Sequence, residues 1–246
     1  MANVKTALVI GAGPAGLACG AELTRHGFRV KVQERTGRAG GLVHLIPPRR
    51  INKDAILRMG QNLDIEFDTC VDLGTIDELA REFDAVVIAT GTQKNRTLAG
   101  TDNRVVFAID FLEKPEKFLP TPKSVAVIGG GDAAIDCAIE ARQHGSSATI
   151  YYRKSREQMR AAKSEVAIAT GAGVKFVFNA PPDDLKKFSE DLIVIAIGQD
   201  PDVPVDLPSN VFLCGDAYLG ATTVAQAIKH ARSVADHVRA ISVLNP

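Results

Sequence analysis

The chain has 246 residues, of which 24% are charged, and its formal net charge at pH 7 is zero. This balance argues against nucleic acid as the main partner, because domains that bind nucleic acid carry a basic surplus. No apolar run reaches the roughly 18 residues needed to span a membrane, and the residues before the first glycines are too few for a signal peptide, so we expect a cytoplasmic protein.

The N-terminal part of the chain alternates strand-like and helix-like segments. A short apolar strand at residues 7–10 runs into the glycines of GAGPAG, a helix is predicted over 14–26, and a second strand is predicted over 29–33. Another apolar run, DAVVIATG at 84–91, ends in glycine. Strands that are apolar throughout and alternate with helices are typical of a parallel sheet covered on both faces.

The same order of segments occurs a second time, 118 residues further along the chain. A strand is predicted at 125–128, the glycines of GGGDAA follow at 129–134, and a helix at 133–144 leads to a second strand at 148–152. Further on, DLIVIAIG at 191–198 matches DAVVIATG at 84–91. A last helix is predicted from about Thr223, over VAQAIKHARSVADHV. We therefore predict an α/β fold with two nested Rossmann-like dinucleotide-binding domains, in which residues 102–197 are inserted between residues 1–101 and 198–246.

The first glycine turn has the spacing of a dinucleotide-binding fingerprint. Gly11 allows a tight turn, Gly13 lets the backbone approach a pyrophosphate, and Gly16 lets helix and strand pack closely. Glu34 lies 18 residues beyond Gly16, at the end of the second strand, where a carboxylate accepts hydrogen bonds from ribose hydroxyls. Because free N–H groups at the helix start attract phosphates, we predict a dinucleotide with a free ribose; a glycine turn that serves packing alone is the alternative.

The second glycine turn lacks this acid. Tyr152 stands at the position that matches Glu34, and Arg153, Lys154 and Arg156 follow it. A 2′-phosphate repels a carboxylate and is bound by cationic donors, so the cluster predicts NADPH rather than NADH. The alternative is a solvated basic loop without a ligand.

The cysteines and histidines give no sign of a metal site. Cys19, Cys70, Cys137 and Cys214 are scattered, and no two of them form C-x-x-C, which argues against zinc, an iron–sulfur cluster or a local redox disulfide. The five histidines show no metal-binding spacing. Cys19 and Cys137 fall among small apolar residues of predicted helices, and we expect both to be buried.

Several motifs together resemble one known family. They are the FAD-binding start GAGPAGLACGAELTRHGFRVKVQER, GGLVHLIPPRRINKD from Gly40, GGGDAAIDC at 129–137, YYRKSREQM at 151–159 and CGDAYLGATTVAQAIKHAR at 214–232. Over nearly the whole chain, these motifs are similar to the two-dinucleotide-binding flavoproteins related to the small (beta) subunit of glutamate synthase. The resemblance implies an architecture like that of the pyridine nucleotide-disulfide oxidoreductases, with bound FAD and hydride exchange with NADPH.

The resemblance also implies which residues contact each cofactor. For FAD they are Gly11, Gly13, Gly16, Glu34, Arg35, Gly41, Leu42, Gly91, Gly215, Asp216 and Val224. For NADPH they are Gly131, Asp132, Ala133, Arg153, Lys154 and Lys163. Ala133 replaces a residue that is usually hydroxylated in the family, so its contact would come from the backbone alone, and Arg160 replaces the family's usual proline.

We name no catalytic side chain, because hydride transfer between nicotinamide and flavin is the chemistry of the cofactors. The helix after Thr223 is expected to point its N-terminus toward the flavin, where it would stabilise negative charge by ~0.3–2 kcal/mol. Larger family members carry an N-terminal iron–sulfur domain, whereas this chain begins at its first strand. We therefore expect an electron-transfer flavoprotein with a separate iron–sulfur partner protein or subunit; the alternative is a nucleotide-binding structural subunit with little activity alone.

Overall fold

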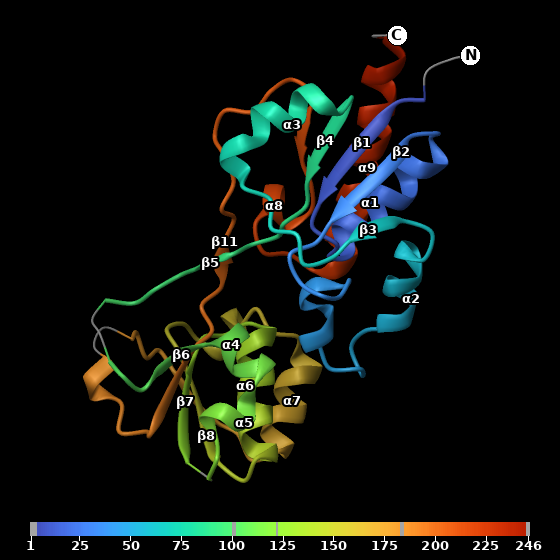
Figure 1. The fold of residues 1–246 in the computed structure, drawn as a ribbon. Coiled ribbons are helices and arrows are strands. Elements are labelled where there is room, and N and C mark those ends of the chain that lie inside the picture. The colour runs from blue at the N-terminus through green and yellow to red at the C-terminus, as the bar shows by residue number, and fades with distance from the viewer. Residues whose placement is uncertain (1–3, 100–101, 122, 183–184, 245–246) are drawn as a thin grey trace. The chain divides into compact units, whose positions relative to one another are not determined.

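The computed structural model describes residues 4–99, 102–121, 123–182 and 185–244, and the chain divides into two compact units (Figure 1). The first unit comprises Met1–Lys94 and Gln199–Pro246, and the second comprises Asn95–Gly198. The expected limit at residue 101 lies outside the described residues, and the first unit already ends at Lys94. Two short strands, β5 (Lys94–Asn95) and β11 (Gln199–Asp200), pair with each other where the chain passes between the units.

The first unit is built on a five-stranded parallel sheet with strand order β12-β4-β1-β2-β3. Its strands are β1 (Thr6–Ile10), β2 (Arg29–Gln33), β3 (Asp64–Glu66), β4 (Ala85–Ile88) and β12 (Val211–Leu213). Alternate residues of β1 serve different cores: Ala7 and Val9 belong to one buried cluster, and Leu8 and Ile10 belong to another. The strands are therefore apolar throughout because both faces of the sheet are covered.

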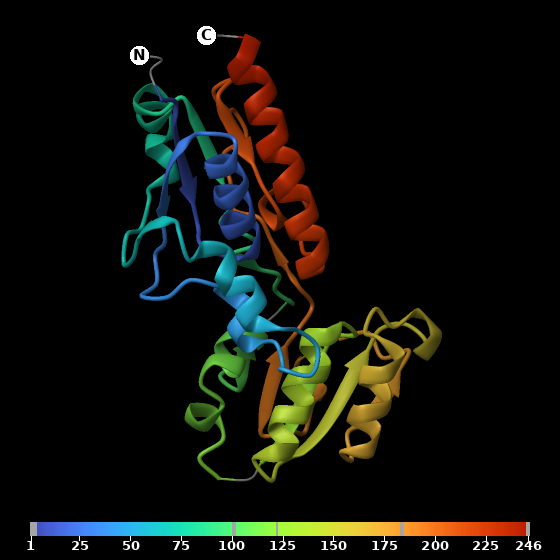
Figure 2. The ribbon, with the colours of Figure 1, turned by 90° about the vertical axis from the view of Figure 1, so that its right-hand side faces the viewer.

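Helices of the first unit cover these two faces. They are α1 (Pro14–Arg25), α2 (Lys53–Leu57), α3 (Ile76–Glu82), α8 (Asp216–Leu219) and α9 (Val224–Leu244), with short 3-10 turns η1 (Gly41–Leu45), η2 (Arg58–Gly60) and η3 (Leu73–Thr75). α1 and α9 pack side by side (Figures 1 and 2). Small buried residues, among them Cys19, Ala231 and Ala235, share the core on that face. The expectation that Cys19 is buried is confirmed.

The second unit repeats this plan with strand order β6-β10-β7-β8-β9, again all parallel. Its strands are β6 (Val105–Phe107), β7 (Ser124–Ile128), β8 (Ser147–Tyr152), β9 (Lys175–Phe178) and β10 (Leu192–Ile195). Its helices are α4 (Ala108–Glu113), α5 (Pro115–Phe118), α6 (Asp132–Gln143) and α7 (Lys163–Gly171), with 3-10 turns η4 (Arg156–Gln158) and η5 (Leu185–Lys187). Cys137 is fully buried in α6, as expected.

The predicted fold class is confirmed, and the predicted segments match the observed ones closely. The helix expected over 14–26 is α1, which ends at Arg25, and the helix expected over 133–144 is α6, which begins one residue earlier, at Asp132. The last helix continues beyond the expected stretch, to Leu244. Among the described residues, no helix is both long and apolar enough to cross a membrane.

Candidate nucleotide-binding sites

The first glycine turn, between β1 and α1, is fixed by close packing. Gly11 has a positive φ of 104°, and a Cβ atom there would lie 2.7 Å from the carbonyl oxygen of Ala89. A Cβ atom on Gly16 would lie 1.9 Å from the carbonyl oxygen of Gly11. Gly13, in contrast, precedes α1 with nothing within 4 Å of its Cβ position. The turn is thus tightly packed at Gly11 and Gly16 and open at Gly13, which leaves room for a phosphate at the N-terminus of α1.

Glu34, directly after β2, is a buried carboxylate with a side chain that holds this turn. It is 6% exposed. One oxygen accepts from the Ala12 N–H at 2.8 Å, and the other accepts from the Thr36 N–H at 2.9 Å and the Thr36 Oγ1 at 2.7 Å. A carboxylate offers about four acceptor positions, so it has room for roughly one further donor. A hydroxyl group is a donor that this remaining position could accept. The neighbouring Arg35 is exposed.

Gly40 and the start of η1 lie against the same turn. The Gly40 N–H donates to the carbonyl oxygen of Ala12 at 2.8 Å, and a Cβ atom on Gly41 would lie 3.3 Å from the Cα of Gly13. Leu42 follows with 45% of its surface exposed. Gly41 and Leu42 therefore lie next to the open side of the glycine turn, although 29 residues separate Gly13 from Leu42.

Gly215 and Asp216 follow β12 and begin α8. A Cβ atom on Gly215, where φ is 62°, would lie 2.4 Å from the Cβ of Ala15, so only glycine fits against α1. The Gly215 N–H donates to Nδ1 of His230 at 3.1 Å. Because that nitrogen accepts, the ring is neutral with its proton on Nε2, and burial lowers the pKa of His230.

Asp216 is half-buried, and burial raises the pKa of its carboxyl group, although the hydrogen bond from Thr222 opposes the rise. Its Oδ1 accepts from the Thr222 Oγ1 at 2.6 Å. α9 begins a few residues later with a capping box: Thr223 Oγ1 accepts from the Gln226 N–H at 3.2 Å, and Gln226 Oε1 accepts from the Thr223 N–H at 3.1 Å. Val224 is the first residue of this helix, and its N–H is among those that a helix leaves without an internal partner.

Strand direction brings these separated residues to one edge of the sheet. Ile10 is paired with Gln33 and with Ile88, and Ile88 is paired with Leu213, so four parallel strands end at the same level. The turn at Gly11, Glu34, Gly91 and Gly215 each follow one of these four strands. The carboxyl edge of a parallel sheet is where such folds bind ligands.

The second glycine turn, between β7 and α6, has the same construction with different closing groups. A Cβ atom on Gly129 would lie 2.3 Å from the carbonyl oxygen of Ala196, whereas nothing lies within 4 Å of the Cβ position of Gly131. Asp132 and Ala133, both exposed, form the first turn of α6, and Asp132 Oδ1 accepts from the Ala162 N–H at 3.2 Å. The N-terminus of α6 is therefore open in the same way as that of α1.

The segment that follows β8 carries the basic residues, and we call residues 153–160 the cationic loop. Its basic residues are Arg153, Lys154, Arg156 and Arg160, all exposed. Lys163, also exposed, is the first residue of α7. Tyr152, which precedes the loop, is 9% exposed, and its hydroxyl donates to the carbonyl oxygen of Gln158 at 2.8 Å.

Two features of these sites were not predicted from the sequence. One is the hydrogen bond from Gly215 to His230, which lies 15 residues away on α9. The other is the position of the Tyr152 ring, which occupies the space where a side chain on Gly130 would lie. The repeated glycine pattern could have pointed to the second feature, because Ala12 in the first turn becomes Gly130 in the second.

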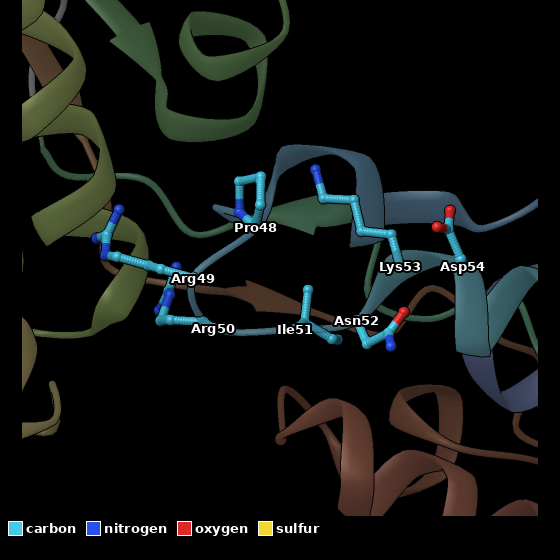
Figure 3. Close-up of a pocket in the computed structure, with 7 residues that line it drawn as sticks. All are labelled: Pro48, Arg49, Arg50, Ile51, Asn52, Lys53 and Asp54. Atoms are coloured by element: carbon cyan, nitrogen blue, oxygen red, sulfur yellow. The ribbon is translucent and has the colours of Figure 1, made fainter.

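A hollow of about 600 Å³ lies on the segment from the end of η1 to the start of α2 (Figure 3). It is lined by Pro48, Arg49, Arg50, Ile51, Asn52, Lys53 and Asp54. In Figure 3 the Arg49 and Arg50 side chains extend on one side of the loop, and Lys53 and Asp54 lie at its other end. Its basic residues suit an anionic group, but none of the predicted site residues lines it.

Two parallel sheets, each with an open helix N-terminus at its carboxyl edge, define a protein of the class that binds two dinucleotides. The model of the family described as pyridine nucleotide-disulphide oxidoreductase matches residues 5–207. The chain belongs to this family. Membership confirms the expected oxidoreductase class, and it implies FAD and NADPH as the cofactors. The open turns at Gly13 and Gly131 and the buried Glu34 fit such groups.

Individual relatives agree with this membership. The chain is 34% identical over 215 residues to the small chain of NADPH glutamate synthase of Azospirillum brasilense, covering 77% of this chain and 44% of that one. It is 34% identical over 196 residues to the beta subunit of the NADPH-Fe(3+) oxidoreductase of Geobacter sulfurreducens, covering 72% and 29%. Thus it spans less than half of either relative. The structure of Lactococcus lactis thioredoxin reductase matches with a TM-score of 0.71 at 18% identity, covering 97% of this chain and 99% of that one, which supports the fold.

Proposed function

We propose that the first unit holds FAD, that the second unit holds NADPH, and that the chain exchanges a hydride between them. The observation that carries this proposal is the contrast between the two glycine turns. Both turns leave the N-terminus of a helix open. The strand beside the first turn is followed by a buried carboxylate, whereas the strand beside the second ends in a tyrosine that is followed by cations. A carboxylate accepts from a free ribose, and cations bind a 2′-phosphate.

In the first unit, the backbone at Gly13 and the first turn of α1 would face the FAD pyrophosphate, and Glu34 would accept from a ribose hydroxyl. Gly11 and Gly16 would shape this turn, since the Gly11 N–H already donates to the carbonyl oxygen of Gln33 at 2.8 Å. Asp216, held by Thr222, would accept from hydroxyls of the flavin side chain. The remaining residues proposed for FAD are Arg35, Gly41, Leu42, Gly91, Gly215 and Val224. Support for this set is that four sequence-distant segments reach one edge of the sheet.

In the second unit, Gly131, Asp132 and Ala133 begin α6, and their backbone would face the NADPH pyrophosphate. Arg153, Lys154 and Lys163 are exposed and free to turn toward a 2′-phosphate. Arginine would bind it through a planar fork and lysine as a point charge. The absence of a carboxylate at Tyr152 removes the group that would repel the phosphate.

The flavin supplies the redox chemistry when bound, since it accepts a hydride from nicotinamide and passes electrons onward. The residues of this chain bind and orient, and we assign none of them as an acid or base. The N-terminus of α9, at Val224, carries unpaired N–H groups and a partial positive charge that would favour a reduced, anionic ring.

For the electron acceptor, we propose an iron–sulfur protein or subunit. The chain has no two cysteines spaced as C-x-x-C, so its sequence offers no local cluster motif. The relative from Geobacter sulfurreducens is named as one subunit of an iron(III) oxidoreductase, which supports a partner arrangement. Binding of nucleotides without turnover, as a structural subunit of a redox complex, is the second candidate.

Steady-state kinetics of the FAD-loaded protein under anaerobic conditions test this function. With NADPH, we expect reduction of an added ferredoxin to be faster than reduction of small organic substrates. Rapid turnover of a small substrate without any protein partner would contradict the proposed acceptor. Absence of NADPH oxidation with every acceptor, including ferricyanide, would favour the structural subunit.

A further inference from the structure

The two glycine turns differ by a pair of exchanges that fit each other. In the first unit, Ala12 lies at the centre of the turn, and its N–H donates to Glu34 at 2.8 Å. In the second unit the corresponding residues are Gly130 and Tyr152. A Cβ atom on Gly130 would lie 2.4 Å from two carbons of the Tyr152 ring. Tyrosine at this position therefore requires glycine beneath it.

The same tyrosine ties down the cationic loop. Its hydroxyl donates to the carbonyl oxygen of Gln158 at 2.8 Å. At the far end of the loop, the N–H groups of Arg160 and Ala161 donate to the carbonyl oxygen of Gly130 at 2.9 and 3.0 Å. The loop thus begins directly after Tyr152, whose ring lies over Gly130, and its C-terminal part is held by the Tyr152 hydroxyl and by backbone hydrogen bonds to Gly130.

The cationic loop is positively charged, so its position affects how tightly an anion binds beside it. It contains four exposed basic residues and one acid, Glu157. Exposed arginine and lysine side chains lose conformational entropy when they are ordered on a ligand, and a backbone fixed in advance reduces the total cost. A closed loop beside the N-terminus of α6 therefore binds an anion more tightly than a mobile loop of the same charge.

We propose that Tyr152, seated on Gly130, is a positioning residue that sets selectivity for a nucleotide with a 2′-phosphate. It does so in two ways: its ring takes the place of the acid that would accept from a free 2′-hydroxyl, and its hydroxyl holds the cationic loop in its binding conformation. This inference rests on the proposed assignment of NADPH to the second unit.

Calorimetric binding of NADP⁺ and NAD⁺ to the oxidised, FAD-loaded protein tests the inference without turnover. Tyr152→Phe keeps the ring and removes one neutral hydrogen bond, so NADP⁺ binding should weaken about two- to tenfold while NAD⁺ binding stays within about twofold. Tyr151→Phe is the matched control. Its hydroxyl donates to Glu190 at 2.7 Å instead of to the loop, and neither affinity should change.

The double variant Gly130→Ala/Tyr152→Glu rebuilds the pair found in the first unit. It should reduce the ratio of NADP⁺ affinity to NAD⁺ affinity at least about tenfold, because a carboxylate repels the 2′-phosphate of NADP⁺ and accepts from the free 2′-hydroxyl of NAD⁺. If this double variant does not fold, as judged by circular dichroism, Tyr152→Phe carries the test alone.

The outcomes separate this inference from the proposed function. Equal binding of NADP⁺ and NAD⁺ by the unaltered protein would overturn the NADPH assignment and the inference together. A clear preference that persists in Tyr152→Phe, as in Tyr151→Phe, would overturn the inference alone. An equal loss of both nucleotides in Tyr152→Phe would mean that the tyrosine supports the turn in general, which also overturns it.

Discussion

Glu34 is the group with the most directly calculable role in the first site. It is 6% exposed, and three donors from Ala12 and Thr36 converge on its two oxygens. In Glu34→Gln, one oxygen becomes an NH₂ group, which must face a backbone N–H whichever way the amide turns. If the amide oxygen stays with Thr36, the N–H of Ala12 loses its acceptor, and Ala12 is fully buried.

An unsatisfied buried donor costs about 1–3 kcal/mol. We therefore expect Glu34→Gln to lower the free energy of unfolding by about that amount in a urea titration of the FAD-free protein. FAD binding should weaken about tenfold as well, because a charged acceptor for a ribose hydroxyl becomes a neutral one. Fluorescence quenching of added FAD measures this second effect.

Glu66→Gln is the matched control for this prediction. Glu66 ends the neighbouring strand β3, its side chain is 44% exposed, and it accepts from Lys31 and Gln33 at 2.8 and 3.0 Å. Water and salt screen such exposed bonds, so we expect Glu66→Gln to lower the free energy of unfolding far less than Glu34→Gln does. If the two variants lose equal stability, or if Glu34→Gln loses none, the role given to the buried carboxylate is wrong.

Three further predictions concern the other site residues. Arg153→Ala should weaken NADPH binding about tenfold and change NADH binding by no more than about twofold, since an exposed charged hydrogen bond contributes in the lower part of the range for such bonds. In the unaltered protein, high salt should reduce the preference for NADPH over NADH, because it screens this contact. For Asp216 the folded-state pKa is raised by burial, so ionisation of this carboxyl group lowers the stability of the protein as pH rises above the ordinary pKa of about 3.9. We therefore expect Asp216→Asn to raise the stability of the FAD-free protein at pH 7. The same variant should weaken FAD binding. For His230 the folded-state pKa is lowered by burial, so the stability of the protein should fall as pH drops below about 6.5. Urea titrations at about pH 7.5 and about pH 5.5 should show that the free energy of unfolding falls less between these two values in His230→Gln than in the unaltered protein.

The fold could be predicted from sequence because its signals are local. Apolar strands, glycine turns and helix ends are each contained in a few neighbouring residues, and their repetition made the second unit visible. Glycine and threonine mark a crossing near residue 101 without showing where the chain leaves the first unit, and contacts between residues divide the chain after Lys94.

The details of the sites depend on contacts between residues far apart in the chain. His230 accepts from Gly215 only because α9 packs beside α1 and contacts β12, where the His237 ring meets the Phe212 ring. Tyr152 lies on Gly130 only because β8 pairs with β7 in a particular register. Spacing alone indicated a missing acid at Tyr152, but the ring that fills its place follows from the register of the sheet.

The absorbance spectrum of the purified protein, recorded anaerobically before and after addition of NADPH, shows directly whether FAD binds and whether NADPH reduces it. We predict flavin bands after reconstitution with FAD and their rapid bleaching by NADPH, with slower bleaching by NADH at the same concentration. A protein that takes up no flavin, or whose flavin bands persist in excess NADPH, would contradict the assignment of FAD to the first unit and NADPH to the second.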